Sequence, residues 1–252
     1  MEPLRKPFQG VLNIIRFNWH FYAIAIVFLC ALLILNPFVD VAFKNYISIV
    51  LITVFTIILS SLIVSFYVYD LSNLYQLDWL DDDKIQINIA NISAGFDETS
   101  HLLELKFKNA KLTALDFYNP ETHTEVSIKR ARKAYPAYAN TVIINTNHIT
   151  LQNDSFDIIF MILAAHEIRN NDERIMFFKE ASSILKPNGQ IIVVEHLRDF
   201  ANFLAYNIGF FHFLSKTSWL KTFQSSNLKI TKIEKITPFI TIFTLQKHGS
   251  TS

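Results

Sequence analysis

Two long runs without a charged residue dominate the N-terminal third of the sequence. The first covers residues 19–39 with its polar edges, and the second covers residues 47–69. A helix needs about 20 apolar residues to cross a bilayer core of roughly 30 Å. Trp19 and Tyr22 mark one end of the first run and Tyr67 and Tyr69 one end of the second, as is typical near a membrane interface. We therefore predict two membrane spans.

Two other interpretations of these runs fit less well. A buried core helix would need neighbouring segments with a polar outer face to cover it, and the first seventy residues supply no such face. A cleaved signal peptide would carry small residues at its cleavage site, which the first run lacks, and the second run follows after only the short segment 36–46. We expect residues 1–70 to form a helical hairpin that anchors the chain.

The distribution of positive charge predicts the orientation of this hairpin. Arg5, Lys6 and Arg16 precede the first span, whereas the connection between the spans carries only Lys44. The positive-inside rule then places the N-terminus in the cytoplasm, and the second span returns the chain there. We expect an integral membrane protein with both termini and all residues after about 70 in the cytoplasm, and a juxtamembrane connector over 71–83 that ends in the acidic cluster at 81–83.

Composition excludes several classes of protein. Apolar residues make up 51% of the chain and charged residues 18%, which excludes intrinsic disorder. The net charge of +1 gives no reason to expect nucleic acid as a partner. A single cysteine, Cys30, excludes disulfide frameworks and thiolate zinc sites. Only five glycines are present, so a glycine-rich phosphate loop is disfavoured. Nothing in the composition indicates an oligomeric state.

Strand-like and helix-like segments alternate over residues 84–248. We expect strands at 85–92, 111–115, 141–144, 156–163 and 190–194, and helices at 97–108, 121–135, 171–185 and 199–223, with a turn at 186–189. Two further strands, 229–235 and 239–246, have no room for a helix between them. This order predicts βαβ units in a parallel sheet that ends in an antiparallel hairpin.

Two segments of this region carry a family resemblance. Residues 153–160 read NDSFDIIF and lead into His166, and residues 184–195 read ILKPNGQIIVVE. Over residues 84–248 the chain resembles the class I S-adenosylmethionine-dependent methyltransferases, of the type 11-like kind. The resemblance implies an α/β, Rossmann-like class I methyltransferase sheet, here preceded by the transmembrane helical hairpin, and S-adenosylmethionine as the cofactor. Ligands of such sheets lie outside the carboxyl ends of the strands.

The first loop of the domain departs from the family pattern. An acidic residue and three spaced glycines are usual there, whereas this chain has Asn91, Ser93, Gly95 and Asp97. The resemblance implies that Asn91, Ser93 and Gly95 lie along the cofactor. Asp97 is better interpreted as the N-cap of the next helix.

Two polar residues further along complete the implied cofactor site. Asp116 ends a strand where the family binds the ribose hydroxyls, with capping of the next turn as the alternative role. Asn145 stands where the family has an Asp near the adenine amino group, and its amide carbonyl can accept the same hydrogen bond.

Candidate catalytic residues follow the fourth and fifth strands. His166 and Glu167 follow one strand and His196 the other, where the resemblance places residues that face the substrate. Each histidine could instead be hydrogen-bonded to loop backbone. Glu195 could face the substrate or pair with Arg198 or Arg169. We expect no metal site, because these residues lack the local spacing of zinc and iron motifs.

An aromatic-rich stretch follows the fifth strand, with seven aromatic residues at Phe200, Phe203, Tyr206, Phe210, Phe211, Phe213 and Trp219. It could be core packing, or it could form a lipophilic pocket or a membrane-facing surface. With the anchor, it favours methylation of a lipophilic small molecule such as a quinone, pigment or lipid. The alternatives are a non-catalytic methyltransferase fold that serves as a membrane-bound interaction module, and another chemistry that uses the same cofactor.

Overall fold

The computed structural model describes residues 5–80 and 87–249. The helices are α1 (Gln9–Phe17), α2 (Trp19–Leu35), η1 (Asn36–Phe38), α3 (Val41–Phe66), η2 (Tyr67–Leu71), α4 (Ser100–Lys106), α5 (Val126–Ala134), η3 (Ala165–Glu167), α6 (Asn171–Ile184), α7 (Phe200–Tyr206), η4 (Asn207–His212) and α8 (Lys216–Ser225). The strands are β1 (Asn88–Ser93), β2 (Lys111–Asp116), β3 (Val142–Ile143), β4 (Phe156–Ile162), β5 (Leu185–His196), β6 (Leu228–Thr237) and β7 (Ile240–Lys247). The predicted acidic cluster at 81–83 and the predicted strand start at 85 lie outside the described residues.

The strands form one seven-stranded sheet in the order β3-β2-β1-β4-β5-β7-β6. The first five strands in this order are parallel to one another, and β7 is antiparallel to both β5 and β6. This arrangement confirms the predicted Rossmann-like class I methyltransferase sheet with a reversed terminal hairpin. Strand order reverses between β1 and β4, so the carboxyl ends of these two strands open the ligand-binding position of such a sheet.

Both faces of the sheet are buried, which explains the nearly continuous apolar sequences of its central strands. On one face α6 and α8 contribute Phe177, Phe178 and Trp219 to a core that includes Ile159 and Val193. The opposite face is covered by a second core, which includes Val68 of η2 together with Leu74, Leu77 and Leu103. The segment predicted as a connector is therefore packed against the sheet.

Several elements differ from the sequence expectation. The helical stretch expected over 199–223 is divided into α7, η4 and α8, and the helix expected over 97–108 is the shorter α4. The helix expected over 121–135 begins only at Val126, because a turn closed by the hydrogen bond from the Asn119 amide to Nδ1 of His123 precedes it (2.9 Å). The fifth strand begins at Leu185 rather than at 190. Leu185 pairs with Phe156, and the register then shifts, so that the expected turn at 186–189 is a bulge within the strand.

Helix α1 was not expected from the sequence, and an acidic residue of another helix caps it. The carboxylate of Asp70 in η2 accepts hydrogen bonds from the amides of Gly10 (2.7 Å) and Val11 (2.8 Å). The other face of α1 meets the sheet domain, where Asn13 accepts a hydrogen bond from the hydroxyl of Tyr135 (2.8 Å). Because Gly10 lies against the backbone and Cβ of Tyr69, a Cβ at this position would clash.

We expect Asp70→Ala to loosen α1 specifically. Losing a carboxylate that satisfies two first-turn amides costs about 1–2 kcal/mol, so hydrogen exchange in residues 9–17 should rise while the central strands stay protected. Mass-spectrometric exchange of the full-length protein measures this. Asp78→Ala, at an exposed position, is the matched control. Unchanged exchange in α1 would contradict the capping role.

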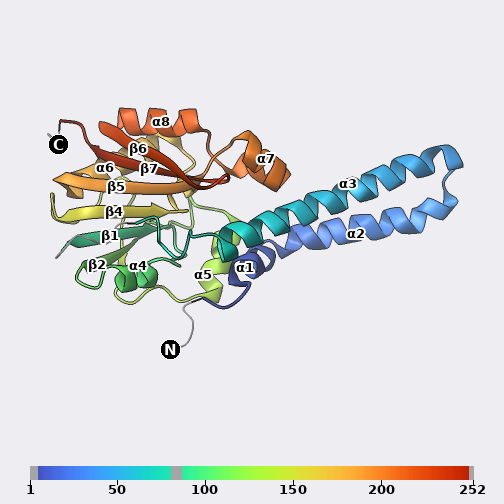
Figure 1. The fold of residues 1–252 in the computed structure, drawn as a ribbon, viewed down its shortest axis with the longest axis horizontal. Helices are drawn as coiled ribbons and strands as arrows, with labels where there is room; N and C mark the ends of the chain where they lie inside the picture. The colour runs from blue at the N-terminus through green and yellow to red at the C-terminus, as the bar shows by residue number, and fades with distance from the viewer. Residues whose placement is uncertain (1–4, 81–86, 250–252) are drawn as a thin grey trace.

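Helices α2 and α3 project from the domain side by side (Figure 1). Two helical segments, Trp19–Phe38 and Val41–Leu71, are long and apolar enough to cross a membrane by length and composition, and none of their most apolar stretch is buried within the protein. The hairpin leaves the domain at the edge where the parallel strands end, because Tyr69 near its base contacts His196 at the end of β5.

Candidate active site

The loop after β1 is organised by the residues that replace the expected acidic and glycine positions. The side-chain Nδ2 of Asn91 lies within donating distance of Asp97 Oδ1 (3.2 Å) and of the hydroxyls of Thr99 (2.9 Å) and Ser100 (2.9 Å). Asp97 Oδ1 also accepts the backbone amides of Thr99 and Ser100 at the start of α4, but the N-cap residue is Thr99 and not the predicted Asp97. Asn91 Oδ1 and Asp97 Oδ2 are buried and have no hydrogen-bond partner among the described residues.

Gly95 is the one glycine of this loop that its geometry requires. Its φ of +88° lies in the left-handed region, and a Cβ there would collide with the side chain of Arg132 and meet Cβ of Tyr118. Ser93 is buried, and its hydroxyl donates to the carbonyl of Leu115 (3.3 Å). The loop therefore approaches the end of β2 closely.

Asp116 lies at the carboxyl end of β2 and is buried. One carboxylate oxygen accepts the amide of Tyr118 (2.8 Å), as in the alternative turn-capping role. The other forms an ion pair with Arg132 of α5 (2.6 Å), whose guanidinium also lies over the Tyr118 ring (4.4 Å to its centroid). The oxygen expected to bind a ribose hydroxyl is thus paired with a cation of this chain.

Asn145 follows β3 and is exposed, and its carbonyl accepts the amide of Asn147 (2.9 Å). It lines a cavity of about 440 Å³ with Asn119, Thr146 and Glu173 among its other walls. Because β3 pairs with the end of β2 through Ile143 and Asp116, this polar cavity adjoins the carboxyl ends of both strands.

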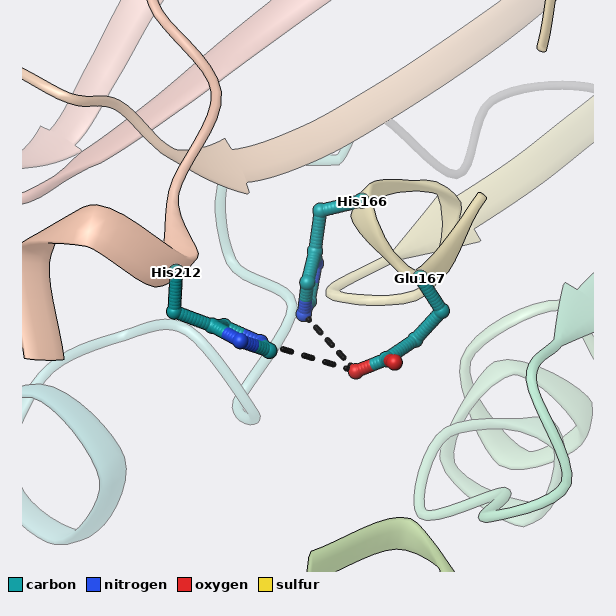
Figure 2. Close-up of side chains that lie close together, drawn as sticks. All are labelled: His166, Glu167 and His212. Carbon is teal, nitrogen blue, oxygen red and sulfur yellow. Dashed lines mark ion pairs between the residues drawn. The ribbon is translucent and has the colours of Figure 1, made fainter. Parts of the chain in front are cut away.

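His166 and Glu167 lie together after β4, and the structure adds His212 of η4 to them (Figure 2). Nε2 of His166 lies 3.3 Å from Glu167 Oε1, and Nε2 of His212 lies 3.6 Å from the same oxygen. On its other nitrogen, His166 donates to Glu195 (2.7 Å), which also accepts the His166 backbone amide (3.2 Å). Glu195 therefore pairs with His166 and not with Arg198 or Arg169.

The charges of this cluster stabilise each other. Burial disfavours the charged form of His166, but Glu195 and Glu167 outweigh it and raise the pKa of His166 to about 10. Burial of Glu167 acts to raise its pKa, and hydrogen bonds with His166 and His212 lower it well below the ordinary value. Glu167 is therefore ionised at neutral pH, and its second oxygen is buried with no partner among the described residues.

His196, the third predicted catalytic residue, lies apart from this cluster in its hydrogen bonds. Its Nδ1 donates to Asn202 Oδ1 (3.0 Å), so Nε2 accepts the Tyr69 hydroxyl (2.8 Å). The ring is also stacked on Phe213. Burial lowers the pKa of His196 to about 4. The structure thus gives His196 the contacts of a neutral histidine that joins the hairpin to the sheet, and its catalytic role stays a prediction.

We expect His196 to make the domain acid-sensitive. Its pKa is about 4 when folded and 6.5 ordinarily, so between these values the unfolded chain binds the proton that the folded chain excludes. The stability contribution is fully present above pH 6.5 and lost as the pH falls to about 4, with a loss of about 3 kcal/mol. Urea unfolding of the full-length protein against pH measures it. His196→Gln should flatten this dependence, whereas a flattening by the exposed His101→Gln would contradict it.

Two residues of the site escaped the sequence expectation. Arg132 was hidden in a helix whose charges resemble an ordinary solvated face, and His212 lies in an aromatic stretch far along the chain from His166. A buried acidic residue such as Asp116 requires a partner, so the sequence could have predicted a cation near Asp116 without identifying Arg132. The sequence contained no comparable signal for His212.

Comparisons with known proteins identify a methyltransferase-like domain that contains the parallel sheet. Residues 91–193 match the model of a family described as Methyltransferase domain. No curated protein matches the sequence. A SAM-dependent methyltransferase from Aquifex aeolicus is similar in structure, with 13% identity, coverage of 71% of this chain and 92% of that chain, and a TM-score of 0.51.

Two further solved structures share the fold. One is an O-methyltransferase from neocarzinostatin biosynthesis, in complex with S-adenosylmethionine and 2-hydroxy-5-methyl naphthoic acid, at 12% identity and a TM-score of 0.51, covering 79% of this chain and 58% of that one. The other is a pyocyanin biosynthetic protein, at 8% identity and a TM-score of 0.52, covering 74% of this chain and 57% of that one. At these identities the structural matches show the fold.

Proposed function

We propose that this chain, which contains a class I S-adenosylmethionine-dependent methyltransferase domain over residues 91–193, methylates a lipophilic small molecule at the surface of the membrane that its hairpin spans. The observation that carries this proposal is the position of the hairpin. It emerges at the carboxyl edge of the parallel strands (Figure 1), where Tyr69 contacts His196. Ligands of such sheets bind at that edge, so the site opens on the membrane side.

The residues of the cofactor loop fit S-adenosylmethionine. The buried, unpartnered oxygens of Asn91 and Asp97 suit a ligand that brings hydrogen-bond donors, such as an ammonium group. Asp116 offers a carboxylate to the ribose once Arg132 moves aside, and Asn145 lines the polar cavity beside it. When bound, the cofactor supplies an electrophilic methyl group on a sulfonium sulfur.

The His166 and Glu167 cluster fits the acceptor side of the reaction. Methyl transfer requires an acceptor positioned in line with the methyl group, and a hydroxyl acceptor must also lose its proton. The free oxygen of Glu167 can accept that hydrogen bond and take the proton as the new bond to carbon forms. Because the pKa of His166 is about 10, His166 is protonated at neutral pH, and it orients Glu167 instead of acting as the base in this state.

Apolar side chains beside the hairpin favour a lipophilic acceptor. Phe200, Phe203 and Leu204 of α7 and Ile208 and Phe211 of η4 are exposed, and α7 packs against α3. Helix α7 lies beside α3 (Figure 1), so these exposed side chains extend the apolar surface of the hairpin onto the domain. A tethered domain has a high effective concentration toward molecules dissolved in the same bilayer. With Arg5, Lys6 and Arg16 before α2, the first span, the domain faces the cytoplasm.

One observation favours a second candidate function. The ion pair between Arg132 and Asp116 occupies a cofactor-facing oxygen with a residue of this chain. A domain in which this pair never opens would be a non-catalytic, membrane-bound interaction module. The two candidates differ in whether the protein binds S-adenosylmethionine.

The first test is cofactor binding followed by transfer. Full-length protein in lipid nanodiscs should bind S-adenosylmethionine with micromolar affinity by calorimetry. With methyl-labelled cofactor and native membranes, label should then enter organic-extractable material, and an aqueous extract should accept little. Absence of heat and of a thermal shift at millimolar cofactor would overturn the enzyme and support the interaction module. Label confined to water-soluble products would overturn only the lipophilic acceptor.

A further inference from the structure

We propose that His166, Glu167 and His212 bind a divalent transition-metal cation. The three side chains come from η3 and η4 and point toward one another (Figure 2). One oxygen of Glu167 lies 3.3 Å from Nε2 of His166 and 3.6 Å from Nε2 of His212. One ligand atom from each residue lies within 4.8 Å of those of the other two.

These distances suit a common metal with little rearrangement. Ligand atoms bound at about 2.1 Å from one metal are separated by roughly 3 to 3.5 Å from each other. Both imidazole-to-carboxylate distances are within or just above that range, and the ligand atoms all lie within 4.8 Å of one another, so a rotation of the side chains would close the site. The bound cation would replace the proton on Nε2 of His166. Two imidazoles and one carboxylate are a donor set for Zn²⁺, Fe²⁺, Mn²⁺ or Co²⁺, and three protein ligands leave positions open for water or another molecule.

A carboxylate outside the cluster orients the imidazole of His166, and Glu125 and Arg169 flank that of His212. Glu195 holds Nδ1 of His166 at 2.7 Å, which directs Nε2 toward Glu167. The ring of His212 lies between Glu125, 3.3 Å from its Nδ1, and Arg169, which contacts Nδ1 and lies 3.1 Å from Nε2. The guanidinium of Arg169 must therefore move away from Nε2 when a cation binds. Hydrogen bonding of the opposite ring nitrogen to a carboxylate is the usual arrangement around a metal-bound histidine. The cluster thus contains ligands and the groups that orient them.

A buried carboxylate oxygen supplies the independent sign of a missing ligand. Glu167 is 3% exposed, and its Oε2 has no hydrogen-bond partner among residues 5–80 and 87–249. A buried, unpaired carboxylate oxygen is costly, and a cation would compensate for it. The carboxylates of Glu125, Glu167 and Glu195 outnumber Arg169, the arginine that contacts His212.

The position of the cluster would allow a bound cation to act on the methyl acceptor. The cluster follows β4 and contacts Glu195 of β5, so a bound cation would lie on the acceptor side of the sheet edge and polarise an acceptor oxygen. This consequence rests on the proposed function, whereas the metal site itself does not. The proposed site differs from the sequence-based expectation of no metal, which rested on the absence of a local zinc or iron motif.

The experiment measures metal alone on the full-length protein in detergent after removal of metals with a chelator. We expect one equivalent of Zn²⁺ to bind with micromolar affinity or tighter by calorimetry, and Co²⁺ to give visible d–d absorption. Glu167→Gln and His212→Gln should each weaken binding at least about 100-fold, and Glu195→Gln about 10-fold. His101→Gln, an exposed histidine paired with Glu104, should change neither measurement.

Three outcomes overturn the proposal. They are the absence of Zn²⁺ and Co²⁺ binding, binding that both ligand variants leave unchanged, and a Co²⁺ spectrum insensitive to His212→Gln. Circular dichroism and S-adenosylmethionine affinity verify that each variant folds. If one of the two ligand variants does not fold, the other still tests the proposal. Metal binding without cofactor binding would contradict the proposed function and leave the metal site standing. Cofactor binding without metal binding would contradict the metal site and leave the proposed function standing.

Discussion

Asp116→Ala is expected to weaken S-adenosylmethionine binding about 100-fold. A hydrogen bond to a charged group contributes about 1.5–3 kcal/mol, and a carboxylate that accepts both ribose hydroxyls makes two. Part of this is already offset because Arg132 must leave Asp116 before the ribose binds, which leaves a net loss of about 3 kcal/mol. Calorimetry in nanodiscs measures the change. Asp154→Ala, at an exposed ion pair with Lys247, is the control, and an equal loss there would contradict the assignment.

The same geometry makes Arg132 a competitor of the cofactor. Its guanidinium fills the space over Gly95 and lies on the Tyr118 ring, so binding requires a conformation in which the ion pair is open. A protein that populates its competent state only in part binds with correspondingly reduced affinity. The companion variant Arg132→Ala should therefore strengthen S-adenosylmethionine binding, opposite to the effect of Asp116→Ala. Weaker binding would show that the guanidinium contacts the ligand.

The fold was predictable because its signals are local. Long uncharged runs identify the hairpin helices, and strands buried on both faces give apolar runs such as 156–163 that need no knowledge of their neighbours. Helix α1 was missed because a short helix is marginal alone, and this one depends on Asp70, some sixty residues away. The bulge in β5 has the sequence of a turn, and only the register with Phe156 places it within the strand.

The site was predictable in its positions but not in its pairings. Asp116, His166 and Glu167 were expected after strand ends, which meet at one edge of a parallel sheet, and they lie at the ends of β2 and β4. Their roles stay predictions. The ion pair of Asp116 with Arg132 depends on which face of α5 meets the loop, and no local pattern fixes that. His212 reaches Glu167 only through the path of the chain after α7. Asn91 was placed along the cofactor by the family resemblance, and the structure directs its side-chain nitrogen to the start of α4 and leaves only Oδ1 for a ligand.

Glu167→Gln is expected to lower kcat about 100-fold or more while the affinity for S-adenosylmethionine changes less than about twofold. The substitution keeps the shape of a buried side chain but removes the charge and the proton-accepting oxygen, and a positioned proton acceptor typically contributes about 10²–10⁴-fold to rate. The cofactor residues Asn91, Asp97 and Asp116 have their own hydrogen bonds, none of which involves Glu167, so cofactor binding should persist.

Single-turnover transfer from labelled cofactor, with affinity measured in parallel, separates the two effects. Glu121→Gln, at an exposed position, should change neither. If Glu167→Gln retained full kcat, deprotonation would not be needed at this oxygen, and the acceptor would be a group that loses no proton in the transfer.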